Sequence, residues 1–425
     1  MRSIENYESN VRSYVRSFPT VFQKAQGTIL TDEQGKEFID FFAGAGTLNY
    51  GHNNPAVSKA LIKYLQEDGV VHGLDMATTA KKNFIQRFYD VILSPRNLEY
   101  KIQFTGPTGT NSVETALKLA RMVKQRSNVI AFTNGFHGLT MGALAVTGND
   151  FYRDESYGVR VNVDRMPFDG YLGNEVDTLK MLRKFLSDSS SGVDLPAAII
   201  TETIQAEGGI RVASKEWLQG LSEICREFDI LLIIDDIQVG NGRTGTFFSF
   251  EEAGIVPDMV CLSKSIGGGL PLALLLIRPE LDQWKPGEHT GTFRGNNLAF
   301  IAAEVLFSYW ENDDLSMAVA QKSEFIRQAL VEMTKKYPDL KMEVRGKGMI
   351  FGLECPQKGV ASLVSSNAFH LGLIIETCGS EGEVIKLLPP LIIQQEELAA
   401  GLKLLDEAIG QIVLQREDVL VGKLS

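Results

Sequence analysis

The chain lacks several features that would assign it to other classes of protein. Only four of its 425 residues are cysteines, and no two of them form a C-x-x-C pair, so neither a disulfide framework nor a zinc site is indicated. The five histidines show no short ligand spacing either, and we expect no catalytic metal. Few and unpaired cysteines fit a reducing cytoplasm.

Long apolar runs and an excess of positive charge are also missing. No stretch approaches the roughly 18 apolar residues of a membrane span, and the opening MRSIENYESN lacks the apolar segment of a signal peptide. The 42 Lys and Arg residues face 53 Asp and Glu residues, and the formal charge of −11 argues against nucleic acid or an anionic membrane as a partner. We therefore expect partners that are small molecules.

What is present is an alternation of short apolar runs with stretches of helical period, from about residue 106 to residue 273. Segments such as SVETALKLARMVKQ and SKEWLQGLSEICREF carry apolar residues three and four apart, which is typical of helices packed on one side. The strand-like runs between them are NVIAF, AAIIT, ILLIID and MVCLS. This order predicts an α/β fold with a mostly parallel sheet covered by helices on both faces, and ligands bind at the carboxyl ends of such strands.

The two ends of the chain have a different pattern. TILTDEQGKEFIDFF near the start predicts a hairpin, VRGKGMIFGLE near the end predicts a strand pair, and QQEELAAGLKLLDEAIGQIV predicts an amphipathic helix. We expect residues 1–55 and 326–425 to form one smaller α+β domain, and residues 56–325 to form the large domain.

An acid and an amine end two successive predicted strands. LLIID runs into Asp235 and Asp236, and MVCLS runs into Lys264, which precedes three glycines. The aspartates could instead cap the following turn, and Lys264 could be an ordinary solvated lysine. Together, however, a carboxylate and a lysine at one rim are the minimal equipment for pyridoxal phosphate (PLP), whose aldehyde forms a Schiff base with lysine and whose ring nitrogen a carboxylate keeps protonated.

A candidate phosphate cradle lies upstream, in FTGPTGTNSVETALKLAR. A turn rich in Gly and Thr opens directly onto a helical pattern there, and backbone N–H groups at a helix start favour a phosphate. Thr110 can add a hydroxyl group. Many such turns are only helix caps, so this segment indicates a phosphate site only in combination with Asp235 and Lys264.

Several motifs together resemble the class III, or ω-amino-acid, PLP-dependent aminotransferases of fold type I. They are LIIDDIQVGNGRTG, SKSIGGGLPLA, GFHG and TFRGNNLA, and the similarity extends from FPTVFQKAQGTILTDEQG to VIKLLPPLII. The resemblance implies a homodimer with shared active sites, with further assembly left open. It also implies that Lys264 forms the Schiff base and moves the proton, and that Asp235 pairs with the ring nitrogen. The other implied cofactor-binding residues are Phe136 and Ile237 on the ring faces, His137, Gln238 near the phenolic oxygen, and Gly109, Thr110 and Thr292 of the partner subunit at the phosphate.

The stretch ETIQAEGG resembles the motif in which the family places a glutamate gate, and that gate corresponds to Glu207. In the family this glutamate pairs with an arginine and releases it when a substrate carboxylate arrives. Here the arginine position is taken by Lys386 of VIKLLPPL, a point charge without the arginine fork. A Glu207–Lys386 pair could still act as the gate, or Lys386 could be a solvated lysine at a strand edge.

Within the family, DFFAGAGTLNYGHNNP, HGLDMAT, HTGTFRGNN and VIKLLPPL resemble the diaminobutyrate–2-oxoglutarate aminotransferases of ectoine biosynthesis. That branch transfers the amino group of L-glutamate to L-aspartate 4-semialdehyde and forms L-2,4-diaminobutyrate. The alternatives are a transaminase for ornithine, 4-aminobutyrate or a polyamine, and a non-catalytic protein that binds a phosphate ligand. A relative without activity would be expected to lack the lysine or the aspartate, and a nucleotide-binding loop fits poorly because neither GNGRTG nor SIGGGLP follows the known fingerprints.

Overall fold

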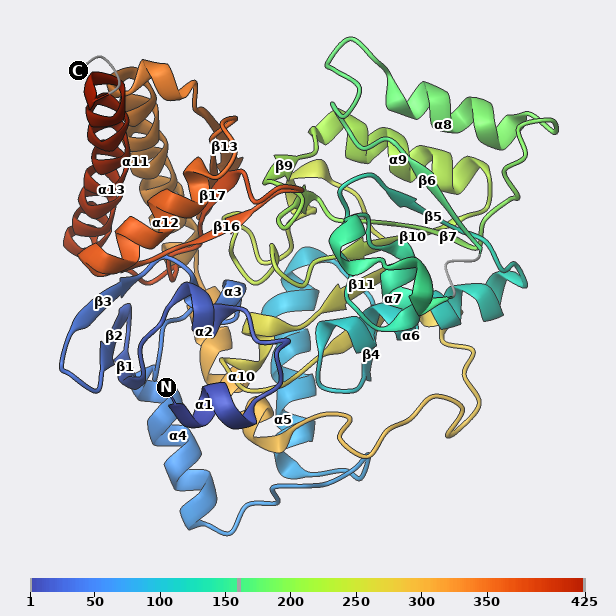
Figure 1. Ribbon diagram of the computed structural model, residues 1–425. Helices are drawn as coiled ribbons and strands as arrows, with labels where there is room; N and C mark the ends of the chain where they lie inside the picture. Colours follow the sequence, from blue (N-terminus) through green and yellow to red (C-terminus); the bar gives the residue numbers. More distant parts are fainter. Residues whose placement is uncertain (1, 159–161, 423–425) are drawn as a thin grey trace.

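A seven-stranded sheet forms the centre of the molecule, which a computed structural model describes for residues 2–158 and 162–422 (Figure 1). Every neighbouring pair of strands is parallel except the two pairs that include β12, which runs antiparallel to both β4 and β11. The expected mostly parallel sheet is thereby confirmed, although the sequence analysis did not predict β12. In spatial order the strands are β4 (Lys101–Phe104), β12 (Leu274–Ile277), β11 (Met259–Leu262), β10 (Leu231–Asp235), β7 (Ala198–Thr201), β5 (Val129–Phe132) and β6 (Val163–Met166).

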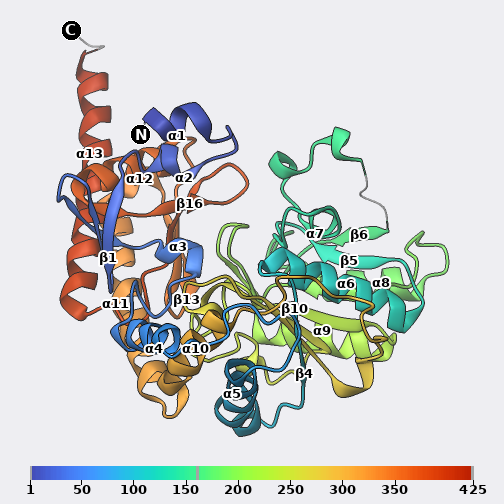
Figure 2. The ribbon, with the colours of Figure 1, turned by 90° about the horizontal axis from the view of Figure 1, so that it is seen from below.

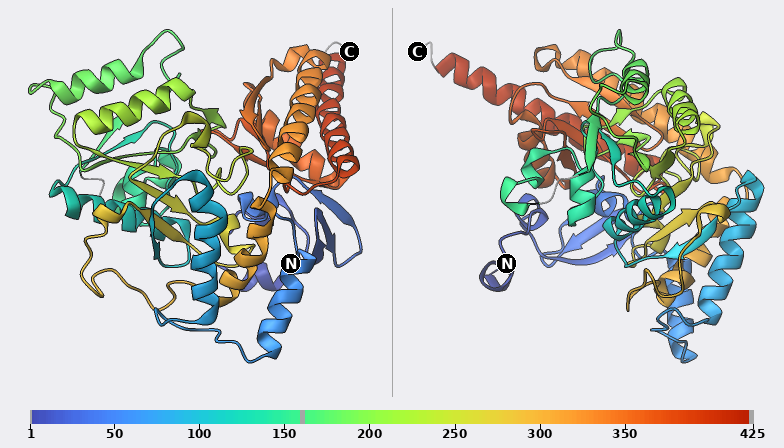
Figure 3. Two further views of the ribbon diagram at one scale, coloured as in Figure 1. Left: turned by 180° about the vertical axis from the view of Figure 1, so that it is seen from behind. Right: turned by 90° about the vertical axis from the view of Figure 1, so that its right-hand side faces the viewer.

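Both faces of this sheet are buried. Along β10, Leu231 and Ile233 join the apolar cluster that contains α6 (Gly109–Lys124), whereas Leu232 and Ile234 join the cluster that contains α9 (Lys215–Glu227). Because successive side chains of a strand point to opposite faces, a strand that is apolar throughout needs cover on both. Figures 1 and 3 show α8 (Thr178–Ser187) and α9 on one side, and α6 and α7 (Met141–Val146) on the other.

The two ends of the chain lie side by side in a second part of the molecule (Figure 2). The predicted N-terminal hairpin is formed by β2 and β3, and β15 from the C-terminal region adds to β3 in parallel. The predicted C-terminal strand pair is also present, as β13 and β14. Both four-stranded sheets, in spatial order, are β1 (Phe22–Gln26), β2 (Ile29–Asp32), β3 (Glu37–Asp40), β15 (Leu373–Ile374), and β13 (Glu343–Lys347), β14 (Ile350–Glu354), β17 (Val384–Leu387), β16 (Glu376–Cys378). The domain limits at residues 55 and 325 stay a prediction.

Helices cover this second part and join it to the first. The long helix α13 (Gln395–Gly422) runs along its outer edge, beside α11 (Asp314–Lys336) and α12 (Val360–Leu371) (Figure 2). α10 (Asn297–Leu306) packs on α4 (Pro55–Gln66) and α5 (Thr79–Phe88) beneath the sheet. Within the two described ranges, no helix combines the length and the apolar character that crossing a membrane requires. The remaining α-helices and strands are α1 (Arg2–Tyr7), α2 (Tyr14–Ser17), α3 (Ala43–Gly46), β8 (Ile204–Gln205) and β9 (Arg211–Val212).

Arg243 connects the two parts of the molecule. It follows β10 in the GNGRTG stretch, and it is fully buried. Its Nη1 donates to the carbonyl oxygens of Met349 and Pro389, at 2.9 and 2.5 Å, and its Nη2 donates to Oδ1 of Asn49. One side chain of the large sheet region therefore holds both the N-terminal and the C-terminal segments in place.

Replacing Arg243 with methionine is expected to lower the free energy of unfolding by about 3 kcal/mol, because buried acceptors lose charge-assisted hydrogen bonds. Urea denaturation followed by fluorescence measures this. Arg183→Met serves as the control, because Arg183 is a half-exposed residue of α8 whose ion pair with Glu227 lies at the surface, and its loss is expected to change stability by less than about 1 kcal/mol. Equal midpoints for the two variants would contradict a tethering role for Arg243.

Candidate active site

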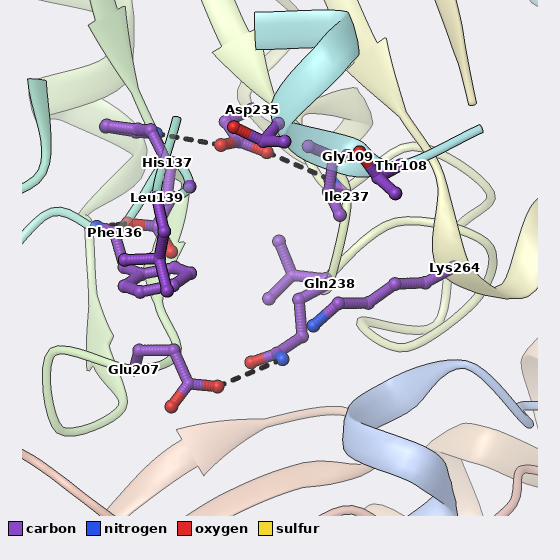
Figure 4. Close-up of a pocket in the computed structure, with 14 residues that line it drawn as sticks. Thr108, Gly109, Phe136, His137, Leu139, Glu207, Asp235, Ile237, Gln238 and Lys264 are labelled. Carbon is purple, nitrogen blue, oxygen red and sulfur yellow. Dashed lines mark hydrogen bonds and ion pairs between the residues drawn. The ribbon is translucent and has the colours of Figure 1, made fainter. Parts of the chain in front are cut away.

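A pocket of about 350 Å³ opens where β10 and β11 end (Figure 4). This volume is in the range of sites that bind small molecules. Nine of the residues predicted from the sequence line it. They are Gly109, Thr110, Phe136, His137, Glu207, Asp235, Ile237, Gln238 and Lys264.

Asp235 is the last residue of β10 and is buried at the floor of the pocket. Its Oδ2 lies 2.8 Å from Nδ1 of His137, and its Oδ1 accepts the backbone N–H of Ile237 at 3.2 Å. Burial alone would lower the pKa of His137, but the hydrogen bond and the charge of Asp235 raise it above its ordinary value. The imidazole therefore binds a proton more readily than an ordinary histidine, and Asp235 is its buried partner. Asp235 does cap the turn through its Oδ1, but its buried contact with His137 shows that capping is not its only role.

Lys264 extends into the same pocket from the end of the neighbouring strand. Its Nζ donates to the carbonyl oxygen of Ala45 at 2.9 Å, and its backbone lies in the left-handed region with φ of 52°. Strain of this kind concentrates at functional sites. Burial lowers the pKa of the amine to about 8, so Lys264 loses its proton far more readily than an ordinary lysine. The alternative of a solvated surface lysine is wrong, and the side chain is suited to nucleophilic attack or proton transfer.

The carbonyl of Ala45 reaches Lys264 through an unusual turn. All four residues of α3, Ala43 to Gly46, have positive φ, between 47° and 84°. Non-glycine residues adopt this left-handed conformation at a cost, so the surrounding packing must hold the turn. Nε2 of Gln238 donates to the same carbonyl at 2.9 Å. The turn thus fixes the resting positions of two pocket side chains.

The cradle predicted upstream is the start of α6. Thr108 caps this helix, and Gly109 and Thr110 occupy its first turn, where backbone N–H groups have no partner inside the helix. A Cβ atom at Gly109 would lie 3.0 Å from the side chain of Ile237, and one at Gly138 would lie 2.4 Å from Oγ1 of Thr110. The glycines therefore allow chain segments to approach each other closely around this helix start. The free backbone N–H groups of the helix start suit an anionic group.

Apolar side chains form the walls of the pocket. Figure 4 shows Phe136 on one side and Ile237 on the other, with room between them. The ring of Phe136 also meets Tyr152 edge-on, with 5.5 Å between the ring centroids. A flat ring could lie between Phe136 and Ile237.

Glu202 is a pocket residue that the sequence analysis missed. It accepts the backbone N–H of Phe136 at 3.0 Å, and burial raises its pKa to about 8. The signal was available, because Glu202 directly follows β7 and so lies at the same carboxyl edge as Asp235 and Lys264. Its hydrogen bond fixes the backbone that carries the Phe136 ring.

Glu207 and Lys386 form an ion pair, with Oε1 and Nζ 2.5 Å apart. Lys386 is completely buried within β17, so the alternative of a solvated lysine at a strand edge is wrong. Burial alone would lower the pKa of Lys386, but Glu207 and Glu376 raise it, and the lysine stays charged. Lys386 in turn lowers the pKa of Glu207 against the effect of burial.

Thr292 is the predicted residue that does not reach the pocket within this chain. It lies in an exposed segment, where its carbonyl oxygen is 3.0 Å from Nε2 of His72. Its assignment to the site of a partner subunit stays a prediction.

Known proteins of one family are similar to this chain over nearly its whole length. The family model described as Aminotransferase class-III matches residues 11–409. The diaminobutyrate–2-oxoglutarate transaminases of Wolinella succinogenes and Halalkalibacterium halodurans are 63% and 56% identical, and each alignment covers 98–99% of both chains.

Solved structures show the same fold. The ornithine aminotransferase from Toxoplasma gondii, with PLP in partial occupancy at its active site, is 26% identical with a TM-score of 0.85 over 98% of this chain and 94% of that one. A Bacillus anthracis aminotransferase is 25% identical with a TM-score of 0.85 over 96% and 97% of the two chains. The fold, the pocket at the ends of β10 and β11, and these similarities show that the chain belongs to the class III aminotransferase family.

Proposed function

We propose that the chain is a PLP-dependent aminotransferase that transfers the amino group of L-glutamate to L-aspartate 4-semialdehyde, yielding L-2,4-diaminobutyrate and 2-oxoglutarate for ectoine biosynthesis. The observation that carries this proposal is the placement of Lys264 and Asp235 at the ends of adjacent strands in one pocket. The names of the relatives at 52–63% identity support the substrate pair.

The pocket residues fit PLP. The start of α6 suits its phosphate, the space between Phe136 and Ile237 suits its ring, and Asp235 suits a protonated ring nitrogen. A further sign is Oε1 of Gln238, a buried oxygen in this pocket without a hydrogen-bond partner among the residues described. A ligand group could satisfy it. When bound, PLP supplies an electron sink that stabilises the negative charge left at the amine-bearing carbon after it loses its proton.

The residues of the chain perform the remaining tasks. Lys264, with a pKa of about 8, can hold the cofactor covalently and move the proton at the amine-bearing carbon. Asp235, oriented by His137, holds a proton at the ring nitrogen. Phe136, Ile237 and Val239 exclude water from the reacting atoms.

The active unit in this proposal is a homodimer in the cytoplasm. Thr292 is exposed and does not line the pocket of its own chain, so it would serve the phosphate of the partner subunit. Phe293 beside it is a large apolar side chain that is 68% exposed, as expected for a surface that a second copy covers. The four cysteines are free and buried, in keeping with a reducing compartment.

The proposal is tested with the enzyme in its PLP form, mixed with one amine at a time, while absorbance reports conversion to the aminated cofactor. L-Glutamate and L-2,4-diaminobutyrate are expected to convert it. Ornithine, which is one methylene longer than diaminobutyrate, is expected to react at least about tenfold less efficiently. If ornithine, 4-aminobutyrate or a polyamine converts the cofactor while diaminobutyrate and glutamate leave the spectrum unchanged, the substrate assignment is wrong.

A further inference from the structure

Lys386 is shared between two carboxylates. Glu376 on β16 lies directly opposite it across the β16–β17 pair, with its Oε1 3.0 Å from Nζ, and Glu207 approaches the same Nζ from the loop after β8. Both partners of the lysine are therefore held by the fold, Glu376 by strand register and Glu207 by the turn that follows β8. The family motif pointed to Glu207 alone, and Glu376 was not predicted.

The cluster of Glu207, Glu376 and Lys386 contains more acidic than basic side chains. The other groups that bind the two carboxylates are neutral, since the hydroxyl of Tyr14 donates to Glu376 at 3.2 Å and the amide of Gln238 donates to Glu207 at 3.1 Å. Across the described part of the chain, Lys386 is the only cation that pairs with either carboxylate. When both carboxylates are ionised, they share one ammonium in direct contact; the other nearby amine, Lys264, acts on them only through space, and PLP would take it up. Burial and the charge of Glu207 raise the pKa of Glu376, and Lys386 opposes both effects, so contact with this lysine is what favours the ionised form of Glu376.

Only Glu207 can present its negative charge to a ligand. Its side chain is 29% exposed and lines the pocket, whereas Glu376 is 6% exposed and lies behind Lys386. Oε1 of Glu207 accepts from Lys386 and Gln238, while its Oε2 has no hydrogen-bond partner among the residues described. Figure 4 shows this carboxylate at the end of the pocket opposite Asp235, beyond Phe136. A cationic group entering the pocket would meet it there.

We propose that Glu207 binds the second ammonium group of a diamine substrate, the one that does not react. Glu376 makes this possible because it also pairs with Lys386, so that Lys386 does not fully neutralise the charge of Glu207. Glu376 is thus a positioning residue that sets amine specificity. The inference rests on the proposed function, because L-2,4-diaminobutyrate carries such a second ammonium. A hydrogen bond between charged groups in a partly buried site is strong enough to discriminate between substrates about tenfold or more.

Three amines of the same reacting chain separate the groups that the site could recognise. L-2,4-Diaminobutyrate carries an ammonium and a carboxylate at the distal carbon, 4-aminobutyrate carries only the carboxylate, and 1,3-diaminopropane carries only the ammonium. In the wild type, kcat/KM for diaminobutyrate is expected to exceed that for 4-aminobutyrate at least about tenfold. In Glu376→Gln, kcat/KM for both diamines is expected to fall about tenfold through KM, because Lys386 then neutralises Glu207 fully, while 4-aminobutyrate and L-glutamate change less than about twofold.

Two further variants complete the experiment. Glu376→Asp keeps the charge and is expected to restore most of the diamine specificity. Glu354→Gln is the matched control, because it removes a carboxylate from another ion pair of the same sheet, with Arg345, outside the pocket. It is expected to leave all ratios unchanged.

Either of two results would overturn the inference: a wild type that uses 4-aminobutyrate as efficiently as diaminobutyrate, or a Glu376→Gln variant that slows all three amines equally. Both leave the proposed function standing. A wild type that reacts with neither diaminobutyrate nor glutamate overturns the proposed function, and the inference with it.

Discussion

Lys264→Ala is expected to lower transamination at least about 10⁴-fold, the largest effect of any substitution in this chain. The variant loses the only amine that lines the pocket among the residues described, and with it both the covalent hold on the cofactor and the group that moves the proton. PLP is still expected to bind through Asp235 and the start of α6. Half-reactions with glutamate measure turnover, and mass spectrometry after borohydride reduction detects the cofactor on the peptide that contains Lys264 in the wild type alone.

Lys184→Ala is the control for this experiment, because Lys184 is an exposed lysine of α8. It is expected to keep both activity and the labelled peptide. Turnover retained by Lys264→Ala would refute the assignment of this residue.

Asp235→Ala is expected to reduce turnover about 10²- to 10³-fold and to release PLP more readily, because no carboxylate remains to keep the ring nitrogen protonated. His137 loses its hydrogen-bond partner in the same variant and stays buried. Dialysis followed by fluorescence of the released cofactor measures retention, and the half-reaction rate measures the chemistry. Asp235→Asn, which keeps the shape without the charge, is expected to lose nearly as much activity.

Asp229→Ala is the matched control for the aspartate. Asp229 is exposed and lies just before β10, at the opposite end of the strand from Asp235, where it pairs with Lys124. Its loss is expected to leave turnover and cofactor retention unchanged. Wild-type rates in Asp235→Ala would show that its pairing with His137 is structural only.

Much of the fold could be predicted because its signals are local. Strands such as β7 and β10 are apolar at every position before their last residue, and only burial on both faces explains that pattern in a chain with ordinary overall composition. The rule that ligands gather at the carboxyl ends of parallel strands then brought Asp235 and Lys264 to one site. The same rule would have found Glu202 if it had been applied to β7.

The rest depended on contacts between distant segments. Tyr14 and Glu376 are separated by 362 positions, and Lys264 and Ala45 by 219. Neither pair leaves a periodic or compositional trace in the sequence, because each contact joins two segments that lie far apart along the chain. The burial of Lys386 could not be predicted either, since a lysine in a strand is usually exposed.

The sequence by itself determined the fold class, the family and the pair of Lys264 and Asp235, because apolar periodicity and motif spacing are properties of neighbouring residues. Only the tertiary structure decided that one lysine is shared by Glu207 and Glu376 and that the carbonyl of Ala45 accepts a hydrogen bond from the amine of Lys264. The physical reason is that charge balance and burial depend on which segments meet in space. In this protein the meeting segments come from both ends of the chain and close over the edge of the central sheet.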